Sequence, residues 1–329
     1  MNTQSKNDDI IYSLHRQMLR IRVLEETLAS RYAEWKMRCP MHLCIGQEAI
    51  AVGVAAALDK SDVFFSNHRS HGHYLAKGGD MKSLVAELYG KRTGCAGGRG
   101  GSMHLIDIDN GFLGSTPIVG GTVPLAVGHA WAAKLNAQKS VTVVFFGDGC
   151  FEEGVLHESM NFASLHKLPV LFICENNGYS VYTSLKERQP DRAIMEIARA
   201  HGLTGWSGNG NSVQSVYDVA CKAEQLARNG NGPQFLELFT HRWREHCGPE
   251  DDDDLEYREE GELQYWMGQD PIKETSDLLM DDHGLDSSRL DLMLKEIEEE
   301  VADAFMFAEQ SAAPGAETLE NGVYKATDD

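Results

Sequence analysis

Two polar side chains with hard oxygen atoms follow two apolar segments near the middle of the chain. Asp148 lies between two glycines directly after the apolar run 141–146, and Asn177 follows the apolar run 170–174. A carboxylate and a carboxamide offer the oxygen ligands that suit Mg²⁺, especially beside phosphate oxygens. The two glycines let the backbone turn sharply and approach a phosphate at the N-terminus of a following helix. The residue types therefore indicate a magnesium and phosphate site.

A strand, a helix and a second strand are needed to bring these two side chains together. Both apolar runs are short and rich in β-branched and aromatic residues, which predicts buried strands. Between them Leu156, Met160 and Ala163 recur at the spacing of one helix face. The right-handed crossover of such a βαβ unit makes the two strands parallel. Asp148 and Asn177 should then reach the same carboxyl edge of the sheet, where open α/β sheets bind ligands.

The spacing of this unit resembles a known cofactor signature. Gly-Asp-Gly alone is most often a plain turn, but here Asn177 follows 29 residues after Asp148. The pattern is similar to the thiamine diphosphate signature, in which the Asp and the last Asn hold the Mg²⁺ that clamps the diphosphate. From about Tyr12 to about Phe307 the chain resembles the α subunit of the E1 component of 2-oxo acid dehydrogenases of the pyruvate, branched-chain and acetoin types. An ordinary βαβ unit without a nucleotide is the alternative.

The resemblance implies roles around the diphosphate. Asp148, the side chain of Asn177 and the backbone carbonyl of Tyr179 correspond to the metal ligands. Gly149 and Cys150 correspond to residues whose backbone N–H groups bind the diphosphate. One departure is Glu152, where the family usually has a small polar residue. Its carboxylate suits a helix N-terminus but lies near an anionic ligand.

Residues 67–73 contain three histidines and an arginine. Arg69 has the fork geometry for a diphosphate oxygen and matches the diphosphate-binding arginine of the family. His68 stands where pyruvate and branched-chain enzymes usually have tyrosine, and there the chain resembles the acetoin type; we expect it to contact the cofactor. His71 aligns with a family histidine at the mouth of the active site and is a catalytic candidate. A metal-binding tract is the alternative for the three histidines, and His73 is expected to have a surface or packing role.

The segment 118–120 aligns with the family segment that holds thiamine in a bent conformation. Bending brings the aminopyrimidine nitrogen to the thiazolium carbon, where it can remove the proton. Val119 is the candidate wedge, although an apolar Ile-Val pair is more often simply core. Pro117 replaces the usual glycine or serine of the family, which leaves the neighbouring backbone contact open.

Residues 242–247 provide the last candidates. His246 stands where the family has a catalytic histidine, and Arg242 where it has a basic pocket residue. Histidine suits proton transfer near neutral pH, and here it would serve transfer of the acyl group. A surface histidine is the alternative. Cys247 replaces the regulatory serine of animal enzymes, and Arg244 and Glu245 replace the usual small residues.

Composition excludes several classes of protein. The 30 basic and 50 acidic residues give a net charge of −20, which argues against nucleic-acid or anionic-membrane surfaces. No apolar run approaches the roughly 18 residues of a membrane span. The polar segment 1–9 shows no signal peptide. Seven cysteines without zinc spacing fit reduced thiols in the cytoplasm.

The chain as a whole is predicted to be α/β, with a thiamine diphosphate-binding fold: a mainly parallel sheet flanked by helices, with helical N- and C-terminal extensions. We expect an N-terminal helical arm (1–40), the α/β domain (41–275), and a C-terminal helix and tail (276–329). The glycine-rich segment 94–104 is neither a P-loop nor a dinucleotide fingerprint; a shaped loop near the cofactor and a plain flexible loop are both open. The acidic run 251–254 is expected to be a solvated loop. Further helices are expected at 10–35, 193–199, 212–228 and 290–308, and a further strand at 235–239.

Thiamine catalysis also needs a glutamate for the aminopyrimidine ring, and the sequence has no second α/β unit to provide it. By resemblance it comes from a separate E1 β subunit in an α2β2 heterotetramer. The implied reaction is oxidative decarboxylation of a 2-oxo acid, first of all pyruvate, or cleavage of acetoin, with transfer of the acyl group to a lipoyl E2 acyltransferase. The alternative enzyme is an acyloin or ketol transferase, similar to transketolase, that uses an aldehyde acceptor. A scaffold subunit with a degenerate site is a third reading, against which Asp148, Asn177, Arg69 and His246 argue.

Overall fold

The centre of the molecule is a six-stranded sheet in which every neighbouring pair of strands is parallel. The computed structural model describes residues 3–281 and 284–320. The strand order is β2-β1-β3-β4-β8-β7, and β5 and β6 form a separate antiparallel pair. This confirms the predicted α/β class with a mainly parallel sheet. The strands are β1 (Val63–Ser66), β2 (Phe112–Ser115), β3 (Thr142–Gly147), β4 (Val170–Asn176), β5 (Tyr179–Ser180), β6 (Thr183–Ser184), β7 (Thr204–Asn209) and β8 (Gln234–Phe239).

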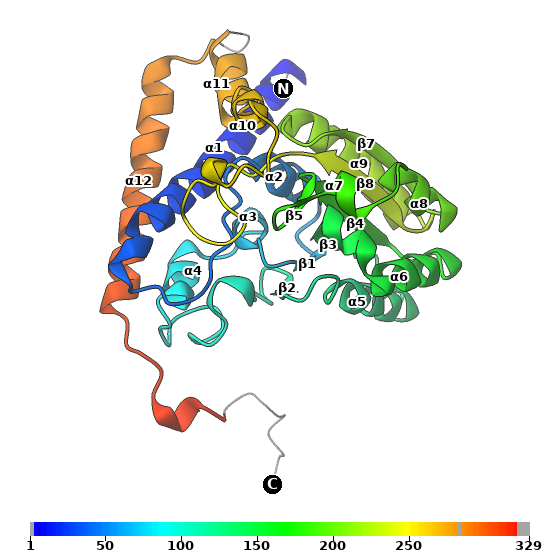
Figure 1. Ribbon diagram of the computed structural model, residues 1–329, viewed down its shortest axis with the longest axis horizontal. Helices are drawn as coiled ribbons and strands as arrows, with labels where there is room; N and C mark the ends of the chain where they lie inside the picture. Colours follow the sequence, from blue (N-terminus) through cyan, green and yellow to red (C-terminus); the bar gives the residue numbers. More distant parts are fainter. Residues whose placement is uncertain (1–2, 282–283, 321–329) are drawn as a thin grey trace.

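Helices cover both faces of this sheet. A long helix lies near each end of the described chain, and these two helices cross each other on one side of the molecule (Figure 1). Short 3₁₀ turns connect several elements, among them Asp148–Glu152 directly after β3. The α-helices are α1 (Thr3–Arg31), α2 (Glu48–Ala56), α3 (His71–Ala76), α4 (Met81–Leu88), α5 (Val123–Leu135), α6 (Gly154–Leu165), α7 (Leu185–Arg188), α8 (Ile194–Ala200), α9 (Val213–Arg228), α10 (Glu262–Met267), α11 (Pro271–Asp281) and α12 (Ser287–Gln310).

The central strands are buried on both faces, which explains why their sequences read as continuous apolar runs. In β4, Leu171 and Ile173 join the core that contains side chains of α1, α2, α4, α9 and α12. Phe172 and Cys174 point the other way, into the core that contains side chains of α5, α6 and α8. Side chains that alternate along one strand therefore fasten two helical layers to one sheet.

The βαβ unit predicted from the sequence is present. β3 begins and ends one residue later than the apolar run 141–146, and α6 buries Leu156, Met160 and Ala163 completely. β3 and β4 are parallel, with Gly147 paired to Glu175. Asp148 and Asn177 therefore leave adjacent strands at the same edge of the sheet, as expected.

The helices at the two ends pack together with the rest of the protein. α1 starts earlier than the predicted 10–35 helix and ends in the 3₁₀ turn Tyr32–Glu34. Arg20 of α1 donates to Glu300 of α12 with an Nε–Oε2 distance of 2.9 Å, and both helices contribute to the same core. The division of the chain at residues 40 and 275 stays a prediction. Within residues 3–281 and 284–320, no helix is long and apolar enough to cross a membrane.

A buried histidine on α1 should make the stability of the fold sensitive to acid. Nδ1 of His15 is hydrogen-bonded to Oγ1 of Thr275 on α11 at 2.8 Å. Burial lowers the pKa of His15 from 6.5 to about 4, and the nearby Asp270 opposes this only in part. Between pH 6.5 and about 4, His15 therefore binds a proton in the unfolded chain but not in the folded chain. The stability due to this group is present above pH 6.5 and is lost as the pH falls toward 4.

We expect His15→Gln to flatten the pH dependence of unfolding. Between pH 6.5 and 4, the wild-type chain should lose up to about 1.4 kcal/mol per pH unit more than the variant. Urea unfolding of both proteins at pH 7 and pH 5 measures this difference. Equal losses in the two proteins would show that His15 does not titrate in this way.

Candidate functional site

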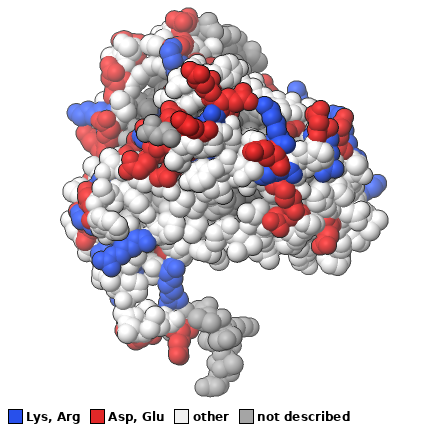
Figure 2. Space-filling model, viewed as in Figure 1, with Lys and Arg blue, Asp and Glu red and all other residues white. Residues whose placement is uncertain are grey.

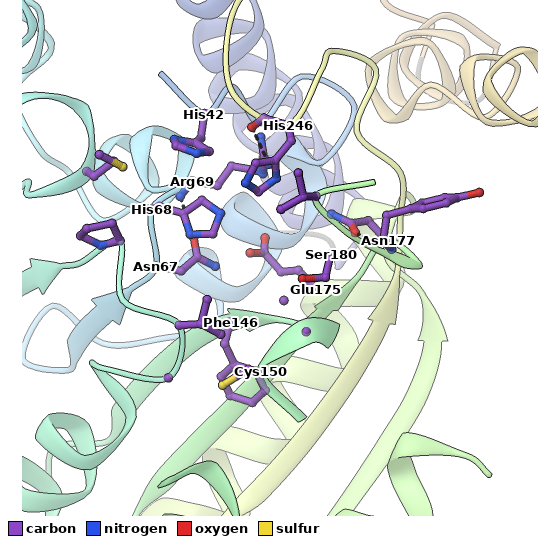
Figure 3. Close-up of a pocket in the computed structure, with 18 of the residues that line it drawn as sticks. His42, Asn67, His68, Arg69, Phe146, Cys150, Glu175, Asn177, Ser180 and His246 are labelled. Carbon is purple, nitrogen blue, oxygen red and sulfur yellow. Dashed lines mark hydrogen bonds between the residues drawn. The ribbon is translucent and has the colours of Figure 1, made fainter. Parts of the chain in front are cut away.

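A cavity of about 230 Å³ opens at the carboxyl edge of the sheet. Its walls come from the segment before α2 and from the segments that follow β1, β2, β3, β4 and β8, so distant parts of the chain meet there (Figure 3). Most residues singled out from the sequence line it, whereas Asp148, His71 and Arg242 do not. The predicted residues in the wall are His68, Arg69, Val119, Gly149, Cys150, Asn177, Tyr179 and His246.

Asp148 lies immediately beneath this wall, in the 3₁₀ turn that follows β3. Its side chain is completely buried, and both adjacent glycines line the cavity. Oδ2 accepts a hydrogen bond from Arg188, whereas Oδ1 has no hydrogen-bond partner within the described part of the chain. Burial raises the pKa of Asp148, and the guanidinium of Arg188 opposes that rise. A buried carboxylate oxygen without a partner suits a cation ligand.

Arg188 explains the departure at Glu152. Its guanidinium lies between the carboxylates of Asp148 and Glu152, and its Nη1 is 2.7 Å from Oε2 of Glu152. Glu152 is therefore ion-paired rather than unpaired beside an anionic ligand, although it shares the single charge of Arg188 with Asp148. Nothing in the local sequence marks Arg188, because it reaches Asp148 only through the fold of α7.

Asn177 is held in place by its own loop and by a distant side chain. Its Oδ1 accepts from the backbone N–H of Tyr179 at 3.2 Å, and its Nδ2 donates to Oε1 of Gln47 at 3.4 Å. Gly178, between Asn177 and Tyr179, adopts φ +79°, a left-handed conformation that favours glycine. The carboxamide is therefore oriented at the cavity wall before any ligand binds.

Arg69 is a buried cation without a carboxylate partner. Only 5% of its surface is exposed, and it donates to the backbone carbonyls of Leu43 and His246. It forms no ion pair with any carboxylate in the described residues. Burial, with Arg242 nearby, lowers its pKa to about 10, so it remains charged at neutral pH. A guanidinium in a cavity wall that forms no ion pair is suited to an anionic group such as a phosphate.

Three imidazoles gather at one end of the cavity, and Figure 3 shows them turned toward one another. The ring centroids of His42, His68 and His246 lie 4.5, 5.0 and 5.4 Å apart in pairs. Burial first, and then the charge of Arg69, lowers the pKa of His42 to about 2 and the pKa values of His68 and His246 to about 3. All three rings are therefore neutral at pH 7. The sequence did not mark His42, a single histidine in an apolar segment.

His71 lies behind the cavity wall and is completely buried. Its Nδ1 is 2.9 Å from Oε1 of Glu25 on α1, and its Nε2 is 2.8 Å from Oγ of Ser102. The ring thus links α1, α3 and the glycine-rich segment 94–104. This places His71 where it can position the neighbouring wall residue Arg69.

The glycine-rich segment 94–104 is a shaped loop. The buried carboxylate of Glu87 accepts hydrogen bonds from four backbone N–H groups of this loop, and Met103 at its end lines the cavity. Of the two interpretations left open by the sequence, the shaped loop near the site is therefore correct. The four donors are Ala96, Gly98, Gly100 and Gly101.

Arg242 is buried beside the cavity and is paired within the protein. Nη1 lies 3.0 Å from Oδ2 of Asp252, and Nη2 donates to the hydroxyl of Tyr257 at 2.8 Å. Asp252 belongs to the acidic run 251–254 and is only 1% exposed. The expectation of a solvated loop is therefore wrong at Asp252, because Arg242 and Arg258 compensate its charge there.

The chemistry of this cavity fits a magnesium diphosphate group. Unpartnered Oδ1 of Asp148 and the carboxamide of Asn177 suit a hard cation, and Arg69 suits the anion. A Cβ atom on Gly149 would lie 2.8 Å from Oγ of Ser180, so a side chain there would crowd the wall. Val119 is 43% exposed and lines the cavity rather than the core.

Comparison with known proteins decides the family. The model of the family described as "Dehydrogenase E1 component" matches residues 16–317. The chain belongs to the dehydrogenase E1 component family. It is 36% identical over 312 residues to the α subunit of acetoin:2,6-dichlorophenolindophenol oxidoreductase from Bacillus subtilis (strain 168), covering 94% of this chain and 92% of that protein. The pyruvate dehydrogenase E1 component subunit alpha of Rickettsia bellii is 34% identical over 309 residues, which is 94% of each chain.

As an E1 α subunit, the chain is a thiamine diphosphate-dependent oxidoreductase. E1 α subunits of this family normally pair with a β subunit and work within a dehydrogenase complex. The fold and the enzyme class expected from the sequence are thereby confirmed. The roles of individual residues remain predictions.

Proposed function

We propose that this E1 α subunit binds thiamine diphosphate through Mg²⁺ and acts with an E1 β subunit, as an α2β2 heterotetramer, on pyruvate or acetoin. The acyl group then passes to the lipoyl group of an E2 acyltransferase. The observation that carries this proposal is the combination of Asn177 and Arg69, which forms no ion pair among the described residues, in one cavity wall with the unpartnered Oδ1 of Asp148 directly beneath that wall. The names of the relatives support pyruvate and acetoin as substrates. A cytoplasmic location stays a prediction.

At the diphosphate end, the proposed metal ligands are Oδ1 of Asp148, the side chain of Asn177 and the backbone carbonyl of Tyr179. The guanidinium of Arg69 would neutralise diphosphate oxygens, and backbone N–H groups of Gly149 and Cys150 would donate to them. These groups lie at or directly beneath the cavity wall, which supports their assignment.

The other end of the cavity is assigned to the reaction. When bound, thiamine diphosphate supplies the carbon that attacks the substrate carbonyl. Val119 would support the bent cofactor, and His68 would contact it. His246, neutral at pH 7 and turned into the cavity, would exchange protons with the reacting groups. His71 and Arg242 would act through the residues they hold, since neither lines the cavity.

This assignment predicts that the purified chain is inactive alone. The described residues contain one parallel sheet, and the glutamate for the aminopyrimidine ring is expected from the β subunit. Mixing the chain with its β subunit should produce pyruvate- or acetoin-dependent reduction of an artificial electron acceptor, together with a mass near that of α2β2. Activity assays and light scattering measure both. Robust decarboxylation of pyruvate by the single chain would contradict the proposal.

The same assay separates the dehydrogenase from a transferase. A dehydrogenase forms NADH when E2, its lipoyl-oxidising partner enzyme, coenzyme A and NAD⁺ are added, because the acyl group must pass to coenzyme A before the lipoyl dithiol can be oxidised. An acyloin or ketol transferase instead forms a new carbon–carbon bond with an added aldehyde and leaves NAD⁺ unchanged. Product analysis with both acceptors present identifies the reaction.

A further inference from the structure

The three imidazoles of the cavity form a set of metal ligands separate from the proposed oxygen site. The ligand atoms of His42, His68 and His246 all lie within 4.8 Å of one another. They come from three segments, before α2, after β1 and after β8, so the fold itself brings them together (Figure 3). Nδ1 of His42 is buried and has no hydrogen-bond partner in the described residues. A buried ring nitrogen without a hydrogen-bond partner, in a residue that belongs to this cluster, suits a metal ligand.

We infer that His42, His68 and His246 bind a zinc-class transition-metal ion in this cavity when thiamine diphosphate is absent. Imidazole nitrogens select borderline cations such as Zn²⁺ or Co²⁺, whereas Mg²⁺ prefers oxygen ligands. Three protein ligands leave a fourth position for water or a substrate oxygen. The ion would compete with the cofactor for His68, which the proposed function assigns to a cofactor contact.

Geometry permits this site with small movements. Zn–N bonds of about 2.0–2.1 Å in a tetrahedron place ligand nitrogens about 3.3 Å apart. The present spread of up to 4.8 Å must therefore shrink by at most about 1.5 Å, which side-chain rotation can supply.

The charge of Arg69 opposes metal binding, because it lies close enough to lower the pKa of each ring. Three imidazole nitrogens that already lie within 4.8 Å of one another favour binding despite this repulsion, since only small side-chain rotations remain to be ordered. A bound zinc would occupy the lone pair of His246. Inhibition of the enzyme would follow, a consequence that rests on the function proposed above, whereas metal binding itself does not.

The test is a Co²⁺ titration of the α–β complex, freed of metal and thiamine diphosphate, followed by competition with Zn²⁺. We expect one Co²⁺ per α chain with the strong visible absorption of a tetrahedral site, displaced by Zn²⁺. His42→Gln and His68→Gln should each weaken zinc binding by more than the roughly 10- to 100-fold that loss of an outer partner costs. His129→Gln is the matched control, because His129 is partly buried on α5 and bonded to Thr142 away from the three rings.

Thiol binding is distinguished in the same experiment. Cys247 is exposed beside His246, and a thiolate ligand would add a sulfur-to-cobalt charge-transfer band that Cys247→Ser removes. Circular dichroism establishes that each variant is folded. Absence of a tetrahedral spectrum in the wild-type complex, or unchanged binding in folded His42→Gln and His68→Gln, would overturn the inference. Failure of thiamine diphosphate to bind would leave this result intact, so the two proposals fail separately.

Discussion

Asp148→Ala abolishes Mg²⁺-dependent binding of thiamine diphosphate and leaves the fold intact. The substitution removes the proposed metal carboxylate from beneath the cavity wall, where water cannot replace it because the side chain is completely buried. We expect a loss of affinity of at least about 100-fold, or about 2.8 kcal/mol. Isothermal titration of the α–β complex with the cofactor in the presence of Mg²⁺ measures it.

Two further variants separate the metal role from the ion pair with Arg188. Asp148→Asn keeps the volume but removes the charge, and it should lose binding like Asp148→Ala. Glu152→Gln removes the other carboxylate that Arg188 contacts, 2.7 Å from its Nη1. It should bind the cofactor nearly as the wild type does. Wild-type affinity in Asp148→Ala, or equal losses in all three variants, would remove Asp148 from the metal site.

His246→Ala is expected to separate the two half-reactions. The first half-reaction depends mainly on the cofactor, the metal and the β-subunit glutamate, whereas lipoyl acylation needs proton transfer at the cavity. Removing a general acid or base typically costs about 10²–10⁴ in rate. NADH formation linked to E2 should therefore fall by that factor, while reduction of an artificial acceptor falls much less. Steady-state assays of both reactions on one preparation give the ratio.

Cofactor binding provides the control for this variant. The backbone carbonyl of His246 that accepts from Arg69 at 3.2 Å is kept in alanine, so the diphosphate contacts should survive. His166→Ala, which changes a histidine directly after α6 and outside the cavity wall, should change neither assay. Equal losses in both assays would assign His246 to the first half-reaction or to the fold. No loss in either would remove it from catalysis and favour the transferase.

Local sequence was sufficient to predict the βαβ unit whose strands precede Asp148 and Asn177. The apolar runs before Asp148 and Asn177 are strands because parallel strands buried on both faces need apolar side chains throughout. Leu156, Met160 and Ala163 mark one helix face because an α-helix repeats every 3.6 residues. The rule that ligands bind at the carboxyl edge of such sheets then located the cavity.

Contacts between distant segments could not be read in the same way. His42 and Arg188 reach the site across long sequence separations, and neither stands in a pattern that marks it. The burial of Asp252 was not predicted, because four adjacent carboxylates repel one another and usually lie in solvent. In the structure Arg242 and Arg258 form ion pairs with Asp252 and so allow its burial. The tertiary fold determines which distant side chains complete a site, whereas the periodicity of apolar residues predicts only the helices and strands.

The central claim is that Asp148 and Asn177 hold the divalent cation of thiamine diphosphate. The most direct measurement is a crystal structure of the α–β complex with the cofactor and Mn²⁺, in which anomalous scattering locates the metal. We expect an anomalous peak about 2.0–2.2 Å from Oδ1 of Asp148 and from the side-chain oxygen of Asn177. A peak elsewhere, or bound cofactor with no metal beside Asp148, would contradict the account.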